Sequence, residues 1–237
     1  MPSDEINQEH IVRSFDEELN LVTATLVRMG GVTEAQLESA VKAIETKDLD
    51  LATSVIETDK ELDKFEQEIE ILVTRLFALR QPMAVDLRSV MAALRISANL
   101  ERIGDYSKNI AYRCKSIIES DSSPSVEGVV RMGSLARQCL RKVLNGYQAQ
   151  DYEVALEAWR QDEDIDKLYT SVFTELVNYM RENPESVTSG TQLAFVGKNI
   201  ERIGDLTTNI AEEIYFMVRG ERLNVSRPKA DTTATIT

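Results

Sequence analysis

The chain has 237 residues, of which 28% are charged and only 6% are aromatic, and its net charge is −13. Such an acidic chain lacks the basic surface that nucleic-acid binding requires, and an anionic membrane surface would repel it. Because Gly, Pro and aromatic residues are scarce, the composition favours long helices over a sheet.

The first half of the chain shows helical periodicity in its apolar residues. Apolar residues recur every three or four positions from residue 9 to about 46, which predicts a first helix. A second helix is predicted over 48–79, where a seven-residue spacing is typical of a helix-bundle seam. That spacing joins Val55, Leu62, Ile69 and Leu76. Arg80-Gln81-Pro82 ends this helix because Pro cannot continue the hydrogen-bond ladder, and a third helix is predicted over 84–119.

The helical pattern restarts after residues 119–126, a Ser-rich stretch with the composition of a linker. Three further helices are predicted at 126–148, 151–182 and 186–219, with Asn183-Pro184 as the break between the last two. We therefore expect an all-α protein of two tandem three-helix bundles. Its parts are a bundle at 1–120, a linker at 121–125, a bundle at 126–220 and a disordered tail at 221–237.

One segment of the sequence occurs twice. Residues 99–111 read NLERIGDYSKNIA, and residues 199–211 read NIERIGDLTTNIA. A shorter segment, Asp59-Lys-Glu-Leu-Asp63, likewise aligns with Asp162-Glu-Asp-Ile-Asp166. Recurrence at this spacing indicates an internal duplication, with one structural unit in each half.

Each half therefore carries an Asp-x-x-x-Asp pair and a Glu-x-x-x-Asp pair, and the four-residue spacing places both acids of a pair on one helix face. Two pairs on neighbouring helices would supply the oxygen ligands that hard divalent cations prefer. Without a cation, four such charges would repel one another. The candidate ligands are Asp59, Asp63, Glu101 and Asp105 in the first half and Asp162, Asp166, Glu201 and Asp205 in the second, with Asn109 and Asn209 one turn further on.

The apolar seams predict where these acids lie relative to the core. If Leu62 and Ile103 face the core, the acids around them lie at its margin or outside it. We therefore expect open surface sites, unlike the inward-facing ligands of ferritin-like bundles, whose Glu-x-x-His motif needs more than the single His10. The simpler interpretation is that these acids are solvated surface residues.

Two other residue types need an interpretation. Gly104 and Gly204 lie inside predicted helices, where Gly is unfavourable. They allow either close helix packing or room for a ligand beside the carboxylates. Cys114 and Cys139 form no metal-ligand or redox motif, and we interpret them as reduced thiols of a cytoplasmic protein.

Taken together, these segments resemble the PhoU family. The resemblance rests on both Glu-Arg-Ile-Gly-Asp segments, both Asp-x-x-x-Asp segments, Arg80-Gln-Pro-Met-Ala-Val-Asp-Leu-Arg88 and Arg28-Met-Gly-Gly31, and it covers residues 8–220. It implies metal binding at the eight acids named above, with the ion left open among Mg, Mn, Fe and Zn. It also implies a cytoplasmic, homodimeric negative regulator of the phosphate-starvation response.

The partners that the resemblance implies are the ATPase of a Pst-type phosphate transporter and a PhoR-type sensor histidine kinase. Nucleic acid and direct membrane insertion are not expected. Two other functions stay open: a helical scaffold that needs no metal, and a metal-dependent hydrolase or oxidase built on a helix bundle. Against the second, the sequence offers no histidine-containing ligand set and no recognisable general base.

Overall fold

The computed structural model describes residues 2–80, 84–120, 122–225, 227 and 229–233. Within these ranges the chain forms six α-helices and one 3₁₀ turn, and it contains no strand. The helices are α1 (Pro2–Thr46), α2 (Leu49–Arg80), α3 (Ala84–Ile118), α4 (Glu127–Ala149), α5 (Tyr152–Glu182) and α6 (Val187–Arg219), with η1 at Pro184–Ser186. The all-α prediction is confirmed. The Gln81-Pro82 break lies outside the described residues.

The turn between the first two helices of each half is the same in both halves. Lys47 and Gln150 each adopt a left-handed conformation, with φ of 56° and 52°. The next residue, Asp48 or Asp151, then accepts a hydrogen bond from a backbone N–H in the first turn of the following helix. An Asp in this position satisfies amide groups that have no partner inside the helix. The internal duplication therefore extends to the turns.

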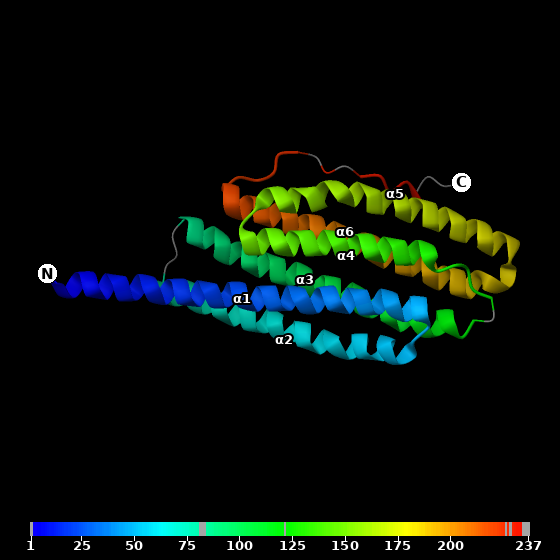
Figure 1. Cartoon of the computed structure of the whole chain (residues 1–237), viewed down its shortest axis with the longest axis horizontal. Coiled ribbons are helices and arrows are strands. Elements are labelled where there is room, and N and C mark those ends of the chain that lie inside the picture. Colours follow the sequence, from blue (N-terminus) through cyan, green and yellow to red (C-terminus); the bar gives the residue numbers. More distant parts are fainter. Residues whose placement is uncertain (1, 81–83, 121, 226, 228, 234–237) are drawn as a thin grey trace.

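Helices α1–α3 and α4–α6 form two three-helix bundles that lie side by side with their helices roughly along one axis (Figure 1). Helix α1 packs on α4 and α3 packs on α6, so each half contributes two helices to the junction. The tandem bundles predicted from the sequence are confirmed.

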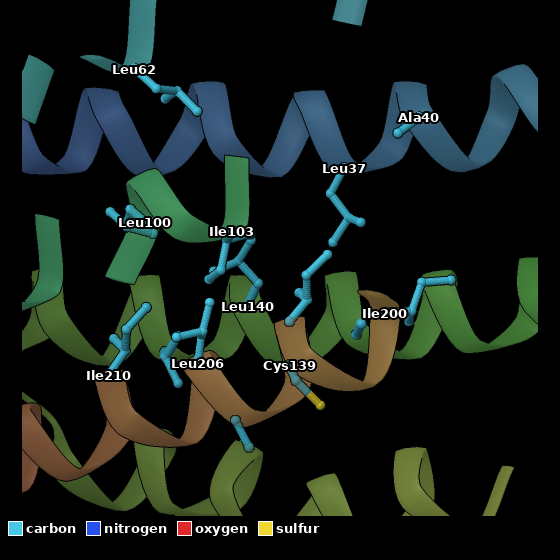
Figure 2. Packing of buried hydrophobic residues seen from close by; sticks show 14 of the residues in the cluster. Leu37, Ala40, Leu62, Leu100, Ile103, Cys139, Leu140, Ile200, Leu206 and Ile210 are labelled. Carbon is cyan, nitrogen blue, oxygen red and sulfur yellow. The ribbon is translucent and has the colours of Figure 1, made fainter. Parts of the chain in front are cut away.

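One buried apolar cluster runs through both halves. Leu37, Leu62 and Ile103 from the first half lie in the same cluster as Leu140 and Ile210 from the second (Figure 2). Burial of a large apolar side chain contributes about 1.5–3 kcal/mol to folding. The core therefore joins the two bundles into one packed body.

Polar contacts flank this junction between α3 and α6. The Arg95 guanidinium lies 3.1 Å from both carboxylate oxygens of Glu213. The Arg113 guanidinium lies over the Phe195 ring, 4.4 Å from its centroid. These polar contacts fix the orientation of α3 relative to α6, while the burial of apolar side chains stabilises the junction.

The two cysteines are free and lie in the core. Burial raises the pKa of the Cys114 thiol to about 11 and that of the Cys139 thiol to about 12. A thiol with so high a pKa is a poor nucleophile near neutral pH. Both cysteines are therefore packing residues, and they are free, as the sequence indicated.

Helix α6 ends at Arg219, and the described residues beyond Gly220 run back along the outer side of α5 (Figure 1). The sequence led us to expect disorder beyond residue 220. The described residues there instead make hydrogen bonds and ion pairs to α5 and α6. None of the helices in the described ranges has the length and hydropathy that a membrane span needs.

Two helical glycines provide a test of the junction. A Cβ atom at Gly133 of α4 would lie 2.9 Å from Cγ1 and 3.2 Å from Cβ of Val41 on α1, whereas a Cβ at Gly31 of α1 would meet nothing within 4 Å. Val41 cannot easily rotate away, because a β-branched side chain is restricted in a helix. We expect Gly133→Ala to lower the free energy of unfolding by about 1–3 kcal/mol. Gly31→Ala should raise it by about 1 kcal/mol, and urea unfolding measures both changes.

Gly31→Ala is the matched control, since it makes the same chemical change inside a helix without a steric neighbour. If both substitutions stabilise the protein equally, α1 and α4 are not in the close contact described above.

Candidate functional site

The eight candidate acids lie on two pairs of packed helices. Helix α2 carries Asp59 and Asp63 and packs on α3, which carries Glu101 and Asp105. In the second half, the Asp pair lies on α5 and the Glu-Asp pair on α6, and these helices also pack together. The fold therefore brings the two acidic pairs of each half together on two neighbouring helices, as the duplicated sequence predicts. We call the four acids of the first half the first cluster and the four acids of the second half the second cluster.

In the first cluster, a lysine bridges the two helices. The Lys108 ammonium lies 2.6 Å from Asp59 Oδ2 on α2 and 2.6 Å from Asp105 Oδ1 on its own helix. Burial alone would lower the pKa of Lys108, but its bonds to Asp105 and Asp59 raise that pKa. A protonated lysine therefore neutralises part of this cluster.

The remaining acids of the first cluster lie close enough to interact. Burial, and then the charges of Asp105, Glu66 and Asp63, raise the pKa of Glu101 to about 7. Glu66, one turn beyond Asp63 on α2, has its own pKa raised by burial and by neighbouring acids. This accumulation of negative charge would favour a bound cation. Asp59 and Glu101 are half-buried and Asp63 is exposed, so these acids of the first half lie at the margin of the core, where the apolar seam placed them.

The second cluster is not open. The exposed fractions of Asp162, Asp166 and Glu201 are 2%, 2% and 6%. The expectation of a surface site is therefore wrong for this half. The periodicity correctly placed these acids beside the apolar seam, but the segment after α6 covers them, and periodicity carries no information on that contact.

Arg227 is the main residue that covers the second cluster. Its guanidinium bonds to Asp162 Oδ2 on α5 and lies 2.5 Å from Asp205 Oδ1 on α6. Three residues later, the Ala230 backbone N–H donates to Asp166 Oδ2 at 2.9 Å. Burial raises the pKa of Asp162 to about 6 even though the charge of Arg227 lowers it. The segment thus contacts acids from both helices.

Lys198 supplies the other counter-charge of the second cluster. Its ammonium lies 2.9 Å from Glu201 Oε2 and 3.2 Å from Asp231 Oδ2, and it lies over the Tyr169 ring at 5.1 Å. Burial raises the pKa of Glu201, and the bond from Lys198 opposes that rise. Glu201 is therefore tied both to its own helix and, through Lys198, to the segment after α6.

The two mid-helix glycines make room for different neighbours. A Cβ atom at Gly104 would collide with the Leu62 side chain, so this glycine allows close apolar packing of α2 on α3. A Cβ at Gly204 would lie 2.5 Å from Asp162 Oδ1. Gly204 therefore lets α6 approach the Asp162 carboxylate on α5, so the glycine of each half allows close helix packing, the first of the two interpretations.

The donor atoms suit a hard cation, although they are not gathered around one. In the described part of the chain, no three acidic, histidine or cysteine side chains are arranged to hold a metal ion. Asp162 Oδ1 is buried and has no hydrogen-bond partner among the described residues. Asn109 and Asn209 are exposed. A metal ion would have to displace Lys108 from the first cluster or Arg227 from the second.

Four residues of these clusters were missed by the sequence reasoning: Glu66, Lys108, Lys198 and Arg227. Lys108 follows Asp105 by three residues, so its helical spacing could have indicated an ion pair. The same spacing joins Lys198 to Glu201. Arg227 lies in a polar segment without periodicity, and no local signal relates it to Asp162.

Comparisons with known proteins agree with this architecture. The PhoU domain matches the chain twice, at residues 26–114 and 129–214. The chain is 46% identical over 224 residues to the phosphate-specific transport system accessory protein PhoU homolog of Caulobacter vibrioides, covering 94% of this chain and 97% of that protein. It is 36% identical over 216 residues to the phosphate-specific transport system accessory protein PhoU of Escherichia coli, covering 90% and 88%.

A solved structure shares the fold. The crystal structure of PhoU from Pseudomonas aeruginosa superposes with a TM-score of 0.85 at 34% sequence identity, covering 87% of this chain and all of that one. Both copies of the matched domain fall on the two helix bundles described above. The chain therefore belongs to the PhoU family.

Proposed function

We propose that this protein is a regulatory accessory protein of phosphate transport and acts without catalysing a reaction. Its relatives in Caulobacter vibrioides and Escherichia coli are named as accessory proteins of the phosphate-specific transport system. Their similarity extends over nearly the whole chain, so it includes both bundles and both acidic clusters. In this proposal the protein is cytoplasmic and restrains the phosphate-starvation response.

The proposed partners are the ATPase subunit of a Pst-type transporter and a PhoR-type sensor kinase. An all-helical chain with two similar bundles offers two comparable surfaces, which suits a protein that connects two partners. We further propose that the working form is a homodimer. Light scattering should then report twice the chain mass of 26.7 kDa.

The proposed ligands of the two clusters are divalent cations. The observation that carries this part is the convergence, in both halves, of an Asp pair and a Glu-Asp pair on packed helices. In the first half, Asp59, Asp63, Glu101 and Asp105 would hold the ion; in the second, Asp162, Asp166, Glu201 and Asp205. Bound metal would neutralise each cluster and fix the distance between its two helices. Mg²⁺, Mn²⁺, Fe²⁺ and Zn²⁺ are the ions to compare.

The competing functions differ in what they require. A metal-dependent hydrolase or oxidase with histidine ligands in both halves is excluded by the single histidine of the chain. A scaffold that needs no metal would keep its stability and its partners without any cation. The metal and partner experiments below therefore separate the proposal from both alternatives.

We expect millimolar Mg²⁺ or Mn²⁺ to raise the melting temperature of chelator-treated protein. At a hundredfold excess over Kd, a ligand that binds only the native state adds about 2.7 kcal/mol to the free energy of unfolding. Glu101→Gln with Asp105→Asn should remove the first site, and Glu201→Gln with Asp205→Asn the second. Elemental analysis should then find about half the metal in each double variant and almost none in the quadruple variant.

Glu57→Gln with Glu61→Gln is the matched control, since both acids are exposed on α2 at the same four-residue spacing. It should leave the metal content unchanged. Loss of all metal in one double variant would mean a single site shared between the halves. Unchanged metal in all three cluster variants would identify these acids as solvated surface residues.

We also expect the tagged protein to retain the transporter ATPase and the sensor kinase from detergent-solubilised membranes. Mass spectrometry of eluates from phosphate-fed and phosphate-starved cells measures this retention. Retention of neither protein under either condition would contradict the coupling role. If the quadruple variant loses its partners as well as its metal, the clusters hold the surfaces that the partners recognise.

A further inference from the structure

The two acidic clusters are neutralised by residues of different origin. In the first half, Lys108 belongs to α3 itself and lies between Asp59 and Asp105. The duplicated segment places Thr208 at the corresponding position of α6, so the second half lacks this lysine. Its place between the two helices is taken by Arg227, which comes from the segment after α6.

Arg227 holds the second cluster together across both helices. Its guanidinium contacts Asp162 from α5 and Asp205 from α6, and only 15% of its side chain is exposed. Breaking a buried ion pair by removing one partner is costly because the other charge is left uncompensated. The cluster therefore needs either Arg227 or another cation in this position.

The contact is made by a segment and not by Arg227 alone. The Ala230 N–H donates to Asp166 Oδ2, the Asp231 carboxylate pairs with Lys198, and the Thr232 N–H donates to Thr170 Oγ1. We call residues 227–232, as far as they are described, the covering segment. It contacts three of the four candidate ligands directly and the fourth, Glu201, through Lys198.

The same oxygens cannot serve the covering segment and a metal ion together. Arg227 occupies Asp162 Oδ2 and Asp205 Oδ1, and the Ala230 amide occupies Asp166 Oδ2. One oxygen of this cluster, Asp162 Oδ1, is buried and has no hydrogen-bond partner in the described ranges. With Arg227 bound, one carboxylate oxygen of the cluster therefore lacks a partner from the described part of the chain. A cation that coordinates several oxygens at once could bind Asp162 Oδ1 as well.

We propose that the covering segment is an internal competitor of divalent cations at the second cluster, so that metal binding there releases Arg227 and residues 230–232 from α5 and α6. This proposal rests on the proposed metal binding of the clusters. The two binding equilibria are linked, so the effect is reciprocal: the covering segment lowers the affinity of the ion by the same factor as the ion lowers the affinity of the segment for the cluster. At the first cluster an ion displaces only the Lys108 side chain, and no chain segment moves.

Affinity measurements test the competition directly. Glu101→Gln with Asp105→Asn provides a full-length background in which only the second cluster binds. In that background, Arg227→Gln should tighten Mn²⁺ binding in calorimetry about tenfold if the segment covers the site about 90% of the time. Arg222→Gln is the matched control, since Arg222 lies between α6 and the covering segment and pairs with Glu213, outside the second cluster. It should leave the affinity unchanged.

Hydrogen exchange reports the release itself. Because the Ala230 amide bonds to Asp166, coverage of about 90% should slow its exchange about tenfold in metal-free protein, and saturating Mg²⁺ should restore the rate of an unprotected amide. Amides of the duplicated segment in α6 should not lose protection. In the Arg227→Gln protein, Ala230 should exchange quickly with or without Mg²⁺.

Each contrary outcome has a distinct meaning. Equal Mn²⁺ affinity with and without Arg227 overturns the competition while leaving the metal site in place. Slower exchange at Ala230 with Mg²⁺ also overturns it, since the segment would then bind together with the ion. Absence of Mn²⁺ binding even in the Arg227→Gln protein overturns both this inference and the metal function on which it rests.

Discussion

The apolar cluster shared by the two bundles is the constraint on which the rest of the structure depends. Long helices with a charged outer face become stable only when their apolar stripes are buried against one another. Leu62 and Ile103 occupy those stripes, so the acids between them are forced to the margins of the helix pairs. Because the core is continuous through α1, α3, α4 and α6, these margins are held on one body.

Charge at these margins then has to be balanced. The two acidic pairs of each half lie on facing helices. Burial, and after it the charges of neighbouring acids, raise the pKa of Glu101 and of Asp162. The first half balances its acids with Lys108 from the same helix. The second half uses Lys198 from α6 and Arg227 from beyond it. The acids therefore occupy equivalent positions in the two halves, whereas the basic residues that neutralise them do not.

This asymmetry changes how the proposed function is understood. Two sites with the same four acids would differ in what a cation must displace: one side chain in the first half, and a chain segment in the second. A regulator that connects a transporter to a kinase needs a part whose position depends on its ligand. In our proposal the segment after α6 is that part, and the first cluster acts as a structural site beside it.

The sequence by itself determined the six helices, their order and the pairing of acids on helix faces. These are local properties, set by spacings of three, four and seven residues. The tertiary structure decided that the bundles share one core and that Asp162, Asp166 and Glu201 are buried. Arg227 lies 65 residues from Asp162, and the residues between them carry no pattern that relates the two. Only the packing of α5 on α6 creates the acidic surface on which that arginine finds its partners.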